Sequence, residues 1–474
     1  MREQSVPDPL KHPLTRRDLL RYGGSAGVAA AGVSNGALWR AASAAATTAT
    51  VRAPDSLPNP KLPAGTVDEA MPFDHIVVVM MENHSFDNLL GALSLSGQPK
   101  ADGLRFNRAG VALNSNPGPS GAVGSFQIPT TAQSPVVSQT WNATHEQIDG
   151  GKMDGFIRSV NSIEPMGYWT EEVLPFAYSL ARTFTIANRW FCSAPCQTYP
   201  NRRFLMAGTA YGDIATNTES LKDPPPPNGT IFDRLNAYGI SWRNYFTDLP
   251  QTAIIPSIIE KYPANITPVT QFFLDCATGN LPSVSFVDPE FGALSDIGEP
   301  LSKVPGIGAL GVKLTETGGD QESPQNMDYG EYWAYQVLDA VLHSPAWPRT
   351  LVIYTYDEHG GYYDHVPPPA AIPPDSIAPE LGPEDLPGGY NIYGPRVPAI
   401  VASPYAKPNA VTDVLHDHTS ALASIEAKWN LPALTYRDAN ASTVMDFLDL
   451  GQAAFLQPPT IAAPPVPVEA TTTT

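Results

Sequence analysis

The chain of 474 residues carries 47 acidic and 28 basic side chains, which give a formal net charge of −19. Because so acidic a protein is repelled by the phosphate backbone of nucleic acids, this charge argues against a nucleic-acid partner. Apolar residues make up 42% of the chain, enough to bury a large core. We therefore expect one large domain over residues 71–450 rather than two smaller ones.

Residues 1–44 contain the features of an export signal in their usual order. Arg16 and Arg17 precede a weakly apolar Gly/Ala stretch from Tyr22 to Val33, and Ala42-Ser43-Ala44 resembles a cleavage site. This order favours a twin-arginine signal over a disordered basic tail, and predicts a periplasmic, cell-wall-associated or secreted protein. Residues 1–44 carry six Lys/Arg and three Asp/Glu, so cleavage after Ala44 would change the net charge from −19 to −22.

The segments at both ends of the predicted domain have a biased composition. Residues 45–70 are rich in Ala, Thr and Pro, which predicts a disordered linker, and residues 451–474 form a Pro-rich tail that we also expect to be disordered. No other stretch approaches the roughly 18 apolar residues of a membrane span, so any membrane contact is expected to be peripheral. Three cysteines are too few for a disulfide framework; if one bridge forms, Cys192 and Cys196 are the simplest pair.

Apolar runs alternate with amphipathic stretches through the rest of the chain. This alternation predicts an α/β fold in which a mostly parallel central sheet is covered by helices on both faces. We expect buried strands at residues 75–81, 239–245, 282–287, 350–356 and 398–403. We expect helices at residues 168–183, 329–343 and 419–429, and loops in the Pro-rich segments 223–228 and 366–387. In such sheets functional groups collect where the strands end at their carboxyl edge.

The first predicted strand runs directly into a polar block, Glu82-Asn83-His84-Ser85-Phe86-Asp87. A carboxylate and an amide side by side at a strand end can offer two hard oxygen ligands to a divalent cation, and Ser85 is placed to cap a following helix. Ordinary turns prefer the same residue types, so this block alone does not establish a metal site.

The strand at 350–356 is followed by a denser block, Asp357-Glu358-His359-Gly360-Gly361, which continues to Asp364, His365 and a run of prolines. Two adjacent carboxylates at a strand end repel each other unless a cation or protons neutralise them. The two glycines let the backbone pass close to a ligand. A solvated acidic turn does not require the second histidine or the rigid proline run. We therefore interpret this block as a ligand site.

A third block, Thr198-Tyr199-Pro200-Asn201-Arg202, precedes a predicted helix over residues 204–210. At a helix start, the Thr198 hydroxyl and the Arg202 guanidinium suit a phosphate group. The residues alone are explained equally simply by a helix cap at Thr198 or Asn201. His145 and His418 add side chains suited to phosphate binding or proton donation, although His418 could also be a satisfied core residue.

Taken together and in this order, the blocks resemble the bacterial phosphoesterase family that contains non-specific phospholipases C and acid phosphatase A. That family's fold belongs to the alkaline phosphatase superfamily. Its blocks E-N-x-S-F-D, T-x-P-N-R and D-E-H-G-G-x-Y-D-H-V match residues 82–87, 198–202 and 357–366, and the resemblance spans residues 74 to about 440.

The resemblance implies a hydrolase of phosphoric esters that uses a divalent metal and a covalent phosphothreonine intermediate. It implies that the metal is held by Glu82, Asn83, Asp357 and Glu358, and that Thr198 completes the coordination sphere and attacks phosphorus. The further expected roles are stabilisation of phosphoryl oxygens by Arg202 and Asn201, phosphate contact by His145, and protonation of the leaving group by His145 or His365.

Threonine at the nucleophile position is typical of the family's phospholipases, whereas its phosphatases more often have serine. We therefore expect a phospholipase C that cleaves phosphatidylcholine-like phosphodiesters, with an acid phosphatase for small phosphomonoesters as the alternative. A non-catalytic surface protein that binds phosphorylated ligands is a third possibility, against which the nucleophile and four metal ligands argue. The oxygen-rich ligand set favours Mg²⁺, Ca²⁺ or Mn²⁺, but the superfamily often uses Zn²⁺, so the metal stays open.

Two departures from the family pattern affect the substrate. Relatives commonly place a histidine near the turn at Asp288 and Pro289, but this chain has no histidine between His145 and His343. One expected phosphate or leaving-group ligand is therefore missing or replaced. The chain also shows no clear β-rich extension after residue 450. Its net acidity predicts a preference for zwitterionic over anionic lipid surfaces.

Overall fold

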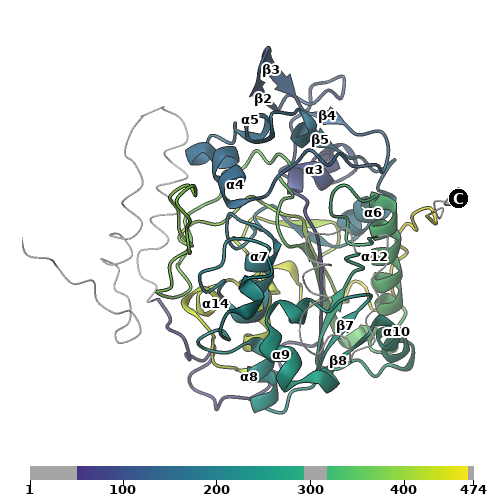
Figure 1. The fold of residues 1–474 in the computed structure, drawn as a ribbon. Coiled ribbons are helices and arrows are strands. Elements are labelled where there is room, and N and C mark those ends of the chain that lie inside the picture. Colours follow the sequence, from purple (N-terminus) through teal and green to yellow (C-terminus); the bar gives the residue numbers. More distant parts are fainter. Residues whose placement is uncertain (1–50, 293–317, 468–474) are drawn as a thin grey trace, which may run out of the picture.

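A computed structural model describes residues 51–292 and 318–467 of the chain (Figure 1). The export signal predicted for residues 1–44 lies outside the described residues. The core is formed by an eight-stranded sheet with the order β12-β6-β11-β10-β1-β9-β7-β8. In that order the strands are β12 (Ala410–Thr412), β6 (Thr185–Ala187), β11 (Ala399–Ala402), β10 (Thr350–Tyr356), β1 (His75–Met81), β9 (Val284–Asp288), β7 (Trp242–Phe246) and β8 (Ile266–Pro268).

All strands of this sheet run in one direction except β11, which is antiparallel to both of its neighbours. The central strands β1 and β10 are continuous apolar runs, with every residue from Ile76 to Met81 and from Thr350 to Tyr356 buried. Such runs are typical of parallel strands that are covered on both faces. The predicted fold class, a mostly parallel sheet between helices, is confirmed.

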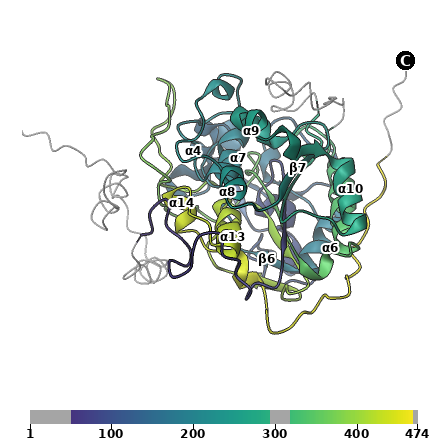
Figure 2. The same ribbon diagram turned by 90° about the horizontal axis from the view of Figure 1, so that it is seen from below.

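Helices cover both faces of the sheet, as the view from below shows (Figure 2). One layer contains α6 (Pro175–Thr183), α10 (Val269–Thr278) and α12 (Met327–Leu342). The other contains α7 (Thr198–Ala207), α8 (Ile231–Ala237) and α13 (Thr419–Trp429), beside the short α14 (Tyr436–Ala439). The remaining described α-helices are α3 (Phe86–Leu90), α4 (Trp141–Ile148), α5 (Phe156–Val160) and α9 (Pro256–Lys261).

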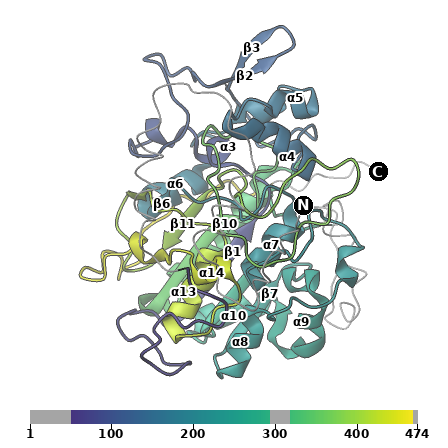
Figure 3. The ribbon, with the colours of Figure 1, turned by 90° about the vertical axis from the view of Figure 1, so that its left-hand side faces the viewer.

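A small two-stranded hairpin projects from the body at the end where α3, α4 and α5 lie (Figures 1 and 3). It consists of β2 (Ser115–Gly118) and β3 (Gly121–Gly124), which pair antiparallel. Directly after it, β4 (Phe126–Gln127) pairs with β5 (Gly167–Tyr168). Because α3 follows β1 almost immediately, the hairpin lies on the side of the molecule to which the carboxyl ends of the central strands point.

Two predicted helices have different limits in the structure. The helix expected at 168–183 begins only at Pro175, and residues 167–168 form β5 instead. Proline suits a first helical position because its missing N–H has no partner there in any case. The helix expected at 204–210 begins earlier, at Thr198, so the whole third sequence block lies on α7.

The predicted linker and tail contact the domain wherever they are described. Residues 51–70 contain no helix or strand, but Asp55 N donates to Ala433 O at 2.8 Å and Asn59 N donates to Asn430 Oδ1 at 2.8 Å. In the tail, the Phe455 ring packs edge-to-face on Phe184. The first segment thus hydrogen-bonds to the domain through its backbone, and the tail contacts the domain through Phe455.

Cys192 and Cys196, the simplest pair if one disulfide bridge formed, are not bridged. All three cysteines of the chain are free and buried, and the Cys192 thiol donates instead to Ala194 O at 3.4 Å. Within the described part of the chain, no helix is long and apolar enough to cross a membrane.

Candidate active site

The first and second sequence blocks meet because β1 and β10 are neighbours. The two strands pair in parallel, with Met81 opposite Tyr356, so the next residues, Glu82 and Asp357, leave the sheet side by side. Two hydrogen bonds join the blocks: Asp357 N donates to Met81 O at 3.1 Å, and Asn83 N donates to Asp357 Oδ1 at 2.9 Å. The carboxyl edge of the sheet therefore carries the site, as expected for parallel strands.

The backbones of the two blocks approach each other very closely at Asn83 and Gly360. Asn83 has a left-handed φ of +68°, and a side chain at Gly360 would collide with the carbonyl oxygen of Asn83. Gly360 itself has a φ of +65°, which a residue with a Cβ rarely adopts. Glycine at this position lets the loop after β10 fold back over Glu82 and Asn83.

Helix α7 brings the third block to the same place. The Thr198 hydroxyl, in the first turn of α7, donates to Glu82 Oε2 at 3.3 Å. Arg202, one turn further on, donates through Nε to Glu82 Oε1 at 2.9 Å and through Nη2 to Met80 O at 3.1 Å. Its third branch, Nη1, donates to Gln251 Oε1 at 3.2 Å. All three side chains at the centre of this cluster, Glu82, Thr198 and Arg202, are buried.

These contacts change the roles expected for Arg202 and Asn201. The guanidinium of Arg202 is occupied on every branch by protein oxygens, so it holds Glu82 in place rather than presenting an open fork to phosphate. The Asn201 side chain accepts from Ala194 N at 3.0 Å and donates to Cys196 O at 2.8 Å and to Gln197 O at 3.1 Å. Asn201 therefore fixes the turn that leads into Thr198.

The cluster contains far more acidic than basic groups. Burial raises the pKa of Glu82 well above its usual value, the neighbouring Asp357 raises it further, and Arg202 opposes both. Burial likewise raises the pKa values of Asp357 and Asp320, again against the effect of Arg202. One guanidinium does not neutralise three buried carboxylates, so the site needs protons or a bound cation.

Several oxygen atoms of the cluster fit a divalent cation. Asn83 Oδ1, Asp357 Oδ2 and Asp320 Oδ2 are buried and accept no hydrogen bond from the described residues. Buried polar atoms are normally paired, and lone carboxylate and amide oxygens are the ligands that hard cations prefer. Asn83 and Asp357, two of the predicted metal ligands, thus each have a buried oxygen without a hydrogen-bond partner, beside Glu82, whose two oxygens accept from Arg202 and Thr198.

The fourth predicted ligand, Glu358, is oriented partly by its own loop. Its Oε2 accepts from Gly360 N at 2.9 Å and lies 3.2 Å from His359 Nδ1. The compact acidic group around Glu82 consists instead of Glu82, Asp320 and Glu322, whose carboxylate oxygens lie within 4.8 Å of one another. The three predicted carboxylates Glu82, Asp357 and Glu358 do not form such a group by themselves in the described part of the chain.

Asp320 and Glu322 were not predicted as site residues. They lie in the short loop before α12, where no predicted strand precedes them, and the only signal in the sequence is two acids that follow two glycines. Glu82 N donates to Asp320 O at 3.0 Å, which fixes this loop to the end of β1. Gln321, between the two acids, has a left-handed φ of +77°, and its carbonyl accepts from Gln133 Nε2 at 2.7 Å.

Asp288 occupies the position near which a histidine was expected. It ends β9 and accepts from Asn244 Nδ2 at 2.6 Å, Gln251 N at 2.7 Å and Gln251 Nε2 at 2.6 Å. Burial raises its pKa to about 7, although these donors and Arg202 lower it. Gln251 donates to Asp288 and accepts from Arg202, which in turn donates to Glu82. Hydrogen bonds thus link Asp288 to Glu82 where relatives commonly have a histidine.

The structure does not join the predicted catalytic histidines to this cluster. His145 lies on α4, where Nδ1 donates to Trp141 O at 2.7 Å and the ring packs on the Trp141 indole at 4.3 Å between centroids. Its buried Nε2 has no hydrogen-bond partner among the described residues and is covered by Gly388. Among the described residues, the hydrogen bond and the ring contact of His145 are both with Trp141 and not with Thr198.

His365 forms an ion network of its own. Nδ1 lies 2.7 Å from Asp87 Oδ2 and Nε2 lies 3.4 Å from Asp102 Oδ1. Burial lowers the pKa of His365, but the two carboxylates outweigh burial and raise it to about 10. Both ring nitrogens are therefore engaged and protonated at neutral pH, which suits a clamp between the first two sequence blocks better than a proton donor to substrate.

His418 is a satisfied core residue, as one of the two interpretations of its sequence allowed. Nε2 donates to Asp357 O at 2.5 Å and Nδ1 accepts from Trp190 Nε1 at 3.4 Å. Burial lowers the pKa of His418 to about 4, so the ring is neutral. It supports Asp357 from behind through the backbone.

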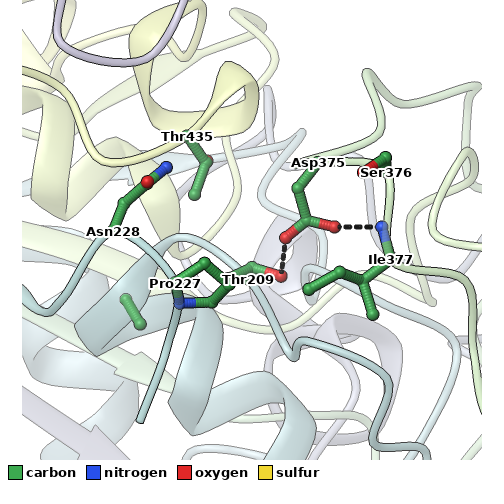
Figure 4. Close-up of a pocket in the computed structure, with 8 residues that line it drawn as sticks. Thr209, Pro227, Asn228, Asp375, Ser376, Ile377 and Thr435 are labelled. Carbon is green, nitrogen blue, oxygen red and sulfur yellow. Dashed lines mark hydrogen bonds between the residues drawn. The ribbon is translucent and has the colours of Figure 1, made fainter. Parts of the chain in front are cut away.

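A small pocket lies at the other end of α7 (Figure 4). Thr198 begins the helix and Ala207, which lines the pocket, ends it, so the two lie about 14 Å apart at 1.5 Å per residue. The one carboxylate in the lining, Asp375, already accepts from Thr209 Oγ1 at 2.6 Å and from Ile377 N at 2.8 Å. The only carboxylate of this pocket is therefore already hydrogen-bonded through both of its oxygens.

The parallel sheet between helices and the acidic cluster at its carboxyl edge suit a hydrolase of phosphoric esters. Residues 73–432 match the phosphoesterase family, and the chain belongs to this family. The sequence is 31% identical over 402 residues to non-specific phospholipase C1 of Arabidopsis thaliana, covering 78% of this chain and 70% of that protein. It is 27% identical over 420 residues to phospholipase C B of Mycobacterium tuberculosis, covering 77% and 75%.

Matches among solved structures include a protein of the alkaline phosphatase superfamily from Vibrio parahaemolyticus. It is 10% identical, covers 73% of this chain and 77% of its own, and has a TM-score of 0.33. Human ectonucleotide pyrophosphatase/phosphodiesterase 5 is 12% identical, covers 58% and 94%, and has a TM-score of 0.30. The membership in the phosphoesterase family that the three sequence blocks indicated is confirmed.

Proposed function

We propose that this chain is an exported phospholipase C that hydrolyses phosphatidylcholine-like phosphodiesters through a phosphothreonine intermediate at Thr198, with the help of a divalent cation. The observation that carries the proposal is the contact between the Thr198 hydroxyl and Glu82 Oε2, 3.3 Å apart, beside oxygens that lack protein donors. The names of the plant and mycobacterial relatives support a phospholipase C over a monoesterase.

The chain's own residues supply the nucleophile and its orientation. Glu82 Oε2 accepts the Thr198 hydroxyl hydrogen, so the proton passes to this atom as Thr198 Oγ1 attacks phosphorus. The P–O bond to the glycerol oxygen then breaks, and the proton held by Glu82 passes to that oxygen, so that diacylglycerol leaves as the neutral alcohol. Water hydrolyses the phosphothreonine diester and releases phosphocholine.

Glu82, Asn83, Asp357 and Asp320 would hold the cation, with Glu358 and Glu322 beside them. A divalent cation bound there lowers the pKa of the nucleophilic hydroxyl and offsets the negative charge of the phosphoryl oxygens. Arg202 keeps Glu82 directed toward Thr198, and Asn201 fixes the turn that carries Thr198. The oxygen ligands favour Mg²⁺, Ca²⁺ or Mn²⁺ over Zn²⁺.

A comparison of three substrates tests the proposal. The purified chain without residues 1–44 is given phosphatidylcholine in dispersed form, a chromogenic phosphocholine ester and a chromogenic phosphomonoester. We expect phosphocholine and diacylglycerol from the lipid, loss of activity with a strong chelator, loss in Thr198→Ala, and residual activity in Thr198→Ser. Inorganic phosphate from the monoester with untouched phosphocholine esters would identify an acid phosphatase instead, and no turnover of any substrate would support a binding protein.

A further inference from the structure

One long segment of this acidic chain contains no acidic residue. Residues 103–145 include Arg105 and Arg108 but no aspartate or glutamate, although the chain has 47 acidic side chains in all. Neither arginine forms an ion pair with a described residue, and both are exposed. The segment is therefore locally basic on a protein whose overall charge is strongly negative.

The same segment exposes aliphatic side chains in a regular pattern. From residue 111 to 117, the odd residues are exposed and the even ones buried, as in a strand with one face on the protein. Val111 and Leu113 are 57% and 56% exposed. Leu113 N donates to Arg105 O at 2.8 Å and Asn107 N donates to Val111 O at 3.0 Å, so a tight hairpin places Arg105 beside Leu113. We call Arg105, Arg108, Val111 and Leu113 the outer face.

The buried side of this hairpin is attached to the candidate active site. Asn114 Nδ2 donates to the Tyr363 hydroxyl at 3.5 Å, and Tyr363 lies in the loop that follows Asp357 and Glu358. The carbonyl of Tyr363 in turn accepts from Ser85 Oγ at 2.6 Å. The chain continues from the outer face into β2 and β3, which project from the end of the molecule where α3, α4 and α5 lie (Figures 1 and 3).

We propose that the outer face is the surface by which this protein docks on a phospholipid bilayer. Exposed aliphatic side chains gain free energy when they enter the boundary between headgroups and acyl chains. Guanidinium groups beside them can bind lipid phosphates with two parallel hydrogen bonds, and no carboxylate on the segment repels those phosphates. The proposal rests on the proposed function, because a phospholipase must bring its site to a lipid surface.

The local charge leads to a different lipid preference from the overall charge. Acidic groups on the body of the protein that lie more than about 10 Å from the bilayer are largely screened at physiological salt. The arginines of the outer face are then the charges nearest to the lipid. We expect a minority of anionic lipid in phosphatidylcholine vesicles to strengthen binding, although the net charge alone predicts the opposite.

Vesicle sedimentation with paired variants tests the docking surface. The double variant Val111→Ser/Leu113→Ser should bind phosphatidylcholine vesicles at least about ten-fold more weakly than wild type, because it removes two aliphatic side chains from the contact. Arg105→Gln/Arg108→Gln should abolish the gain from phosphatidylglycerol and flatten the salt dependence. Leu274→Ser, at a leucine that is 55% exposed on α10, is the matched control and should bind like wild type.

Turnover of a soluble chromogenic phosphocholine ester should stay unchanged in both double variants, which also shows that they fold. Wild-type binding by both double variants, an equal loss in Leu274→Ser, or absence of vesicle binding by the wild type would each overturn the docking surface. Failure of the proposed function would give a different result: the soluble ester would not be cleaved by the wild type, while vesicle binding would still depend on the outer face.

Discussion

The substitution Arg202→Met gives the sharpest test of how the site is held together. Methionine keeps an unbranched aliphatic stem but removes the guanidinium. Glu82 Oε1 would then lose its contacts with Arg202 Nη2 at 2.8 Å and Nε at 2.9 Å. The oxygens of Met80 and Gln251 would each lose a donor. All of these groups are buried, so water cannot replace the lost contacts. Removing one partner of a buried ion pair costs about 3–5 kcal/mol, a large part of the roughly 5–15 kcal/mol by which a protein is stable.

The matched control is Arg243→Met on β7. Arg243 Nη1 lies 2.6 Å from Asp275 Oδ2; the Arg243 side chain is 37% exposed and the Asp275 side chain 7%. Because water reaches the guanidinium and Asp275 keeps hydrogen bonds from Tyr245 and Gln271, the loss of Arg243 should cost less than the loss of Arg202. The free energy of unfolding of both variants and of the wild type is measured by urea denaturation in the presence of a chelator.

The deficit of Arg202→Met should also depend on pH. Arg202 lowers the pKa of Glu82, so in the variant burial and Asp357 raise that pKa further above its value in the unfolded chain. A carboxyl with a raised folded pKa stabilises the protein at low pH, and this contribution is lost as pH rises above the unfolded pKa. The deficit should therefore be larger at neutral than at acid pH. A cost for Arg202→Met no greater than that for Arg243→Met, or one that is the same at all pH values, would refute the buried ion pair as the support of Glu82.

Three further substitutions probe separate features. Asp320→Asn should weaken cation binding in titration calorimetry at least about ten-fold, since it removes a ligand charge. The control Asp339→Asn, at an exposed carboxylate on α12, should leave the affinity for the cation unchanged. Equal affinities of the two variants would exclude Asp320 from the site. His365→Gln should destabilise the protein below pH 6.5, and this difference should disappear as pH rises through about 10, because the folded pKa of His365 is raised. A difference that grows with pH would contradict this. Changing Arg16 and Arg17 to Lys should retain the precursor inside the cell, and normal export would exclude the twin-arginine pathway.

The central strands could be predicted from sequence because they are continuous apolar runs. The predicted ranges 75–81 and 350–356 are the limits of β1 and β10. Because both faces of these strands are buried, almost every residue is apolar, and the run does not show the spacing of an amphipathic helix. The helix at 168–183 was harder to delimit, because residues 168–174 have an amphipathic composition but are not helical. Tyr168 pairs with β4, and the helix begins only at Pro175.

The site was predictable only where it follows the ends of strands. Glu82 and Asp357 meet because their strands pair, and sequence order together with the parallel sheet was enough to expect it. Asp320 belongs to a loop whose position is set by tertiary contacts, and no local pattern indicates that it reaches Glu82. The contacts of Arg202 could not be predicted for a related reason: its sequence position indicates a cation near phosphate, but not that it donates to Glu82, Met80 and Gln251.

The balance of charge at the site leads to a last prediction about substrate binding. Glu82 accepts from the Thr198 hydroxyl and lies beside Asp320, and Asp357 is hydrogen-bonded to the residue that follows Glu82. The guanidinium of Arg202 donates through each of its three nitrogens to protein oxygens. A phosphodiester is itself an anion, so the site without a cation should repel the substrate that it is built to cleave. Chelation should therefore prevent binding and not merely turnover. In the Thr198→Ala variant, which keeps the carboxylates but lacks the nucleophile, phosphocholine should bind in calorimetry only after a divalent cation is added. Equal affinity with and without the cation would show that the protein alone holds the phosphate, and would move the phosphate site away from Glu82.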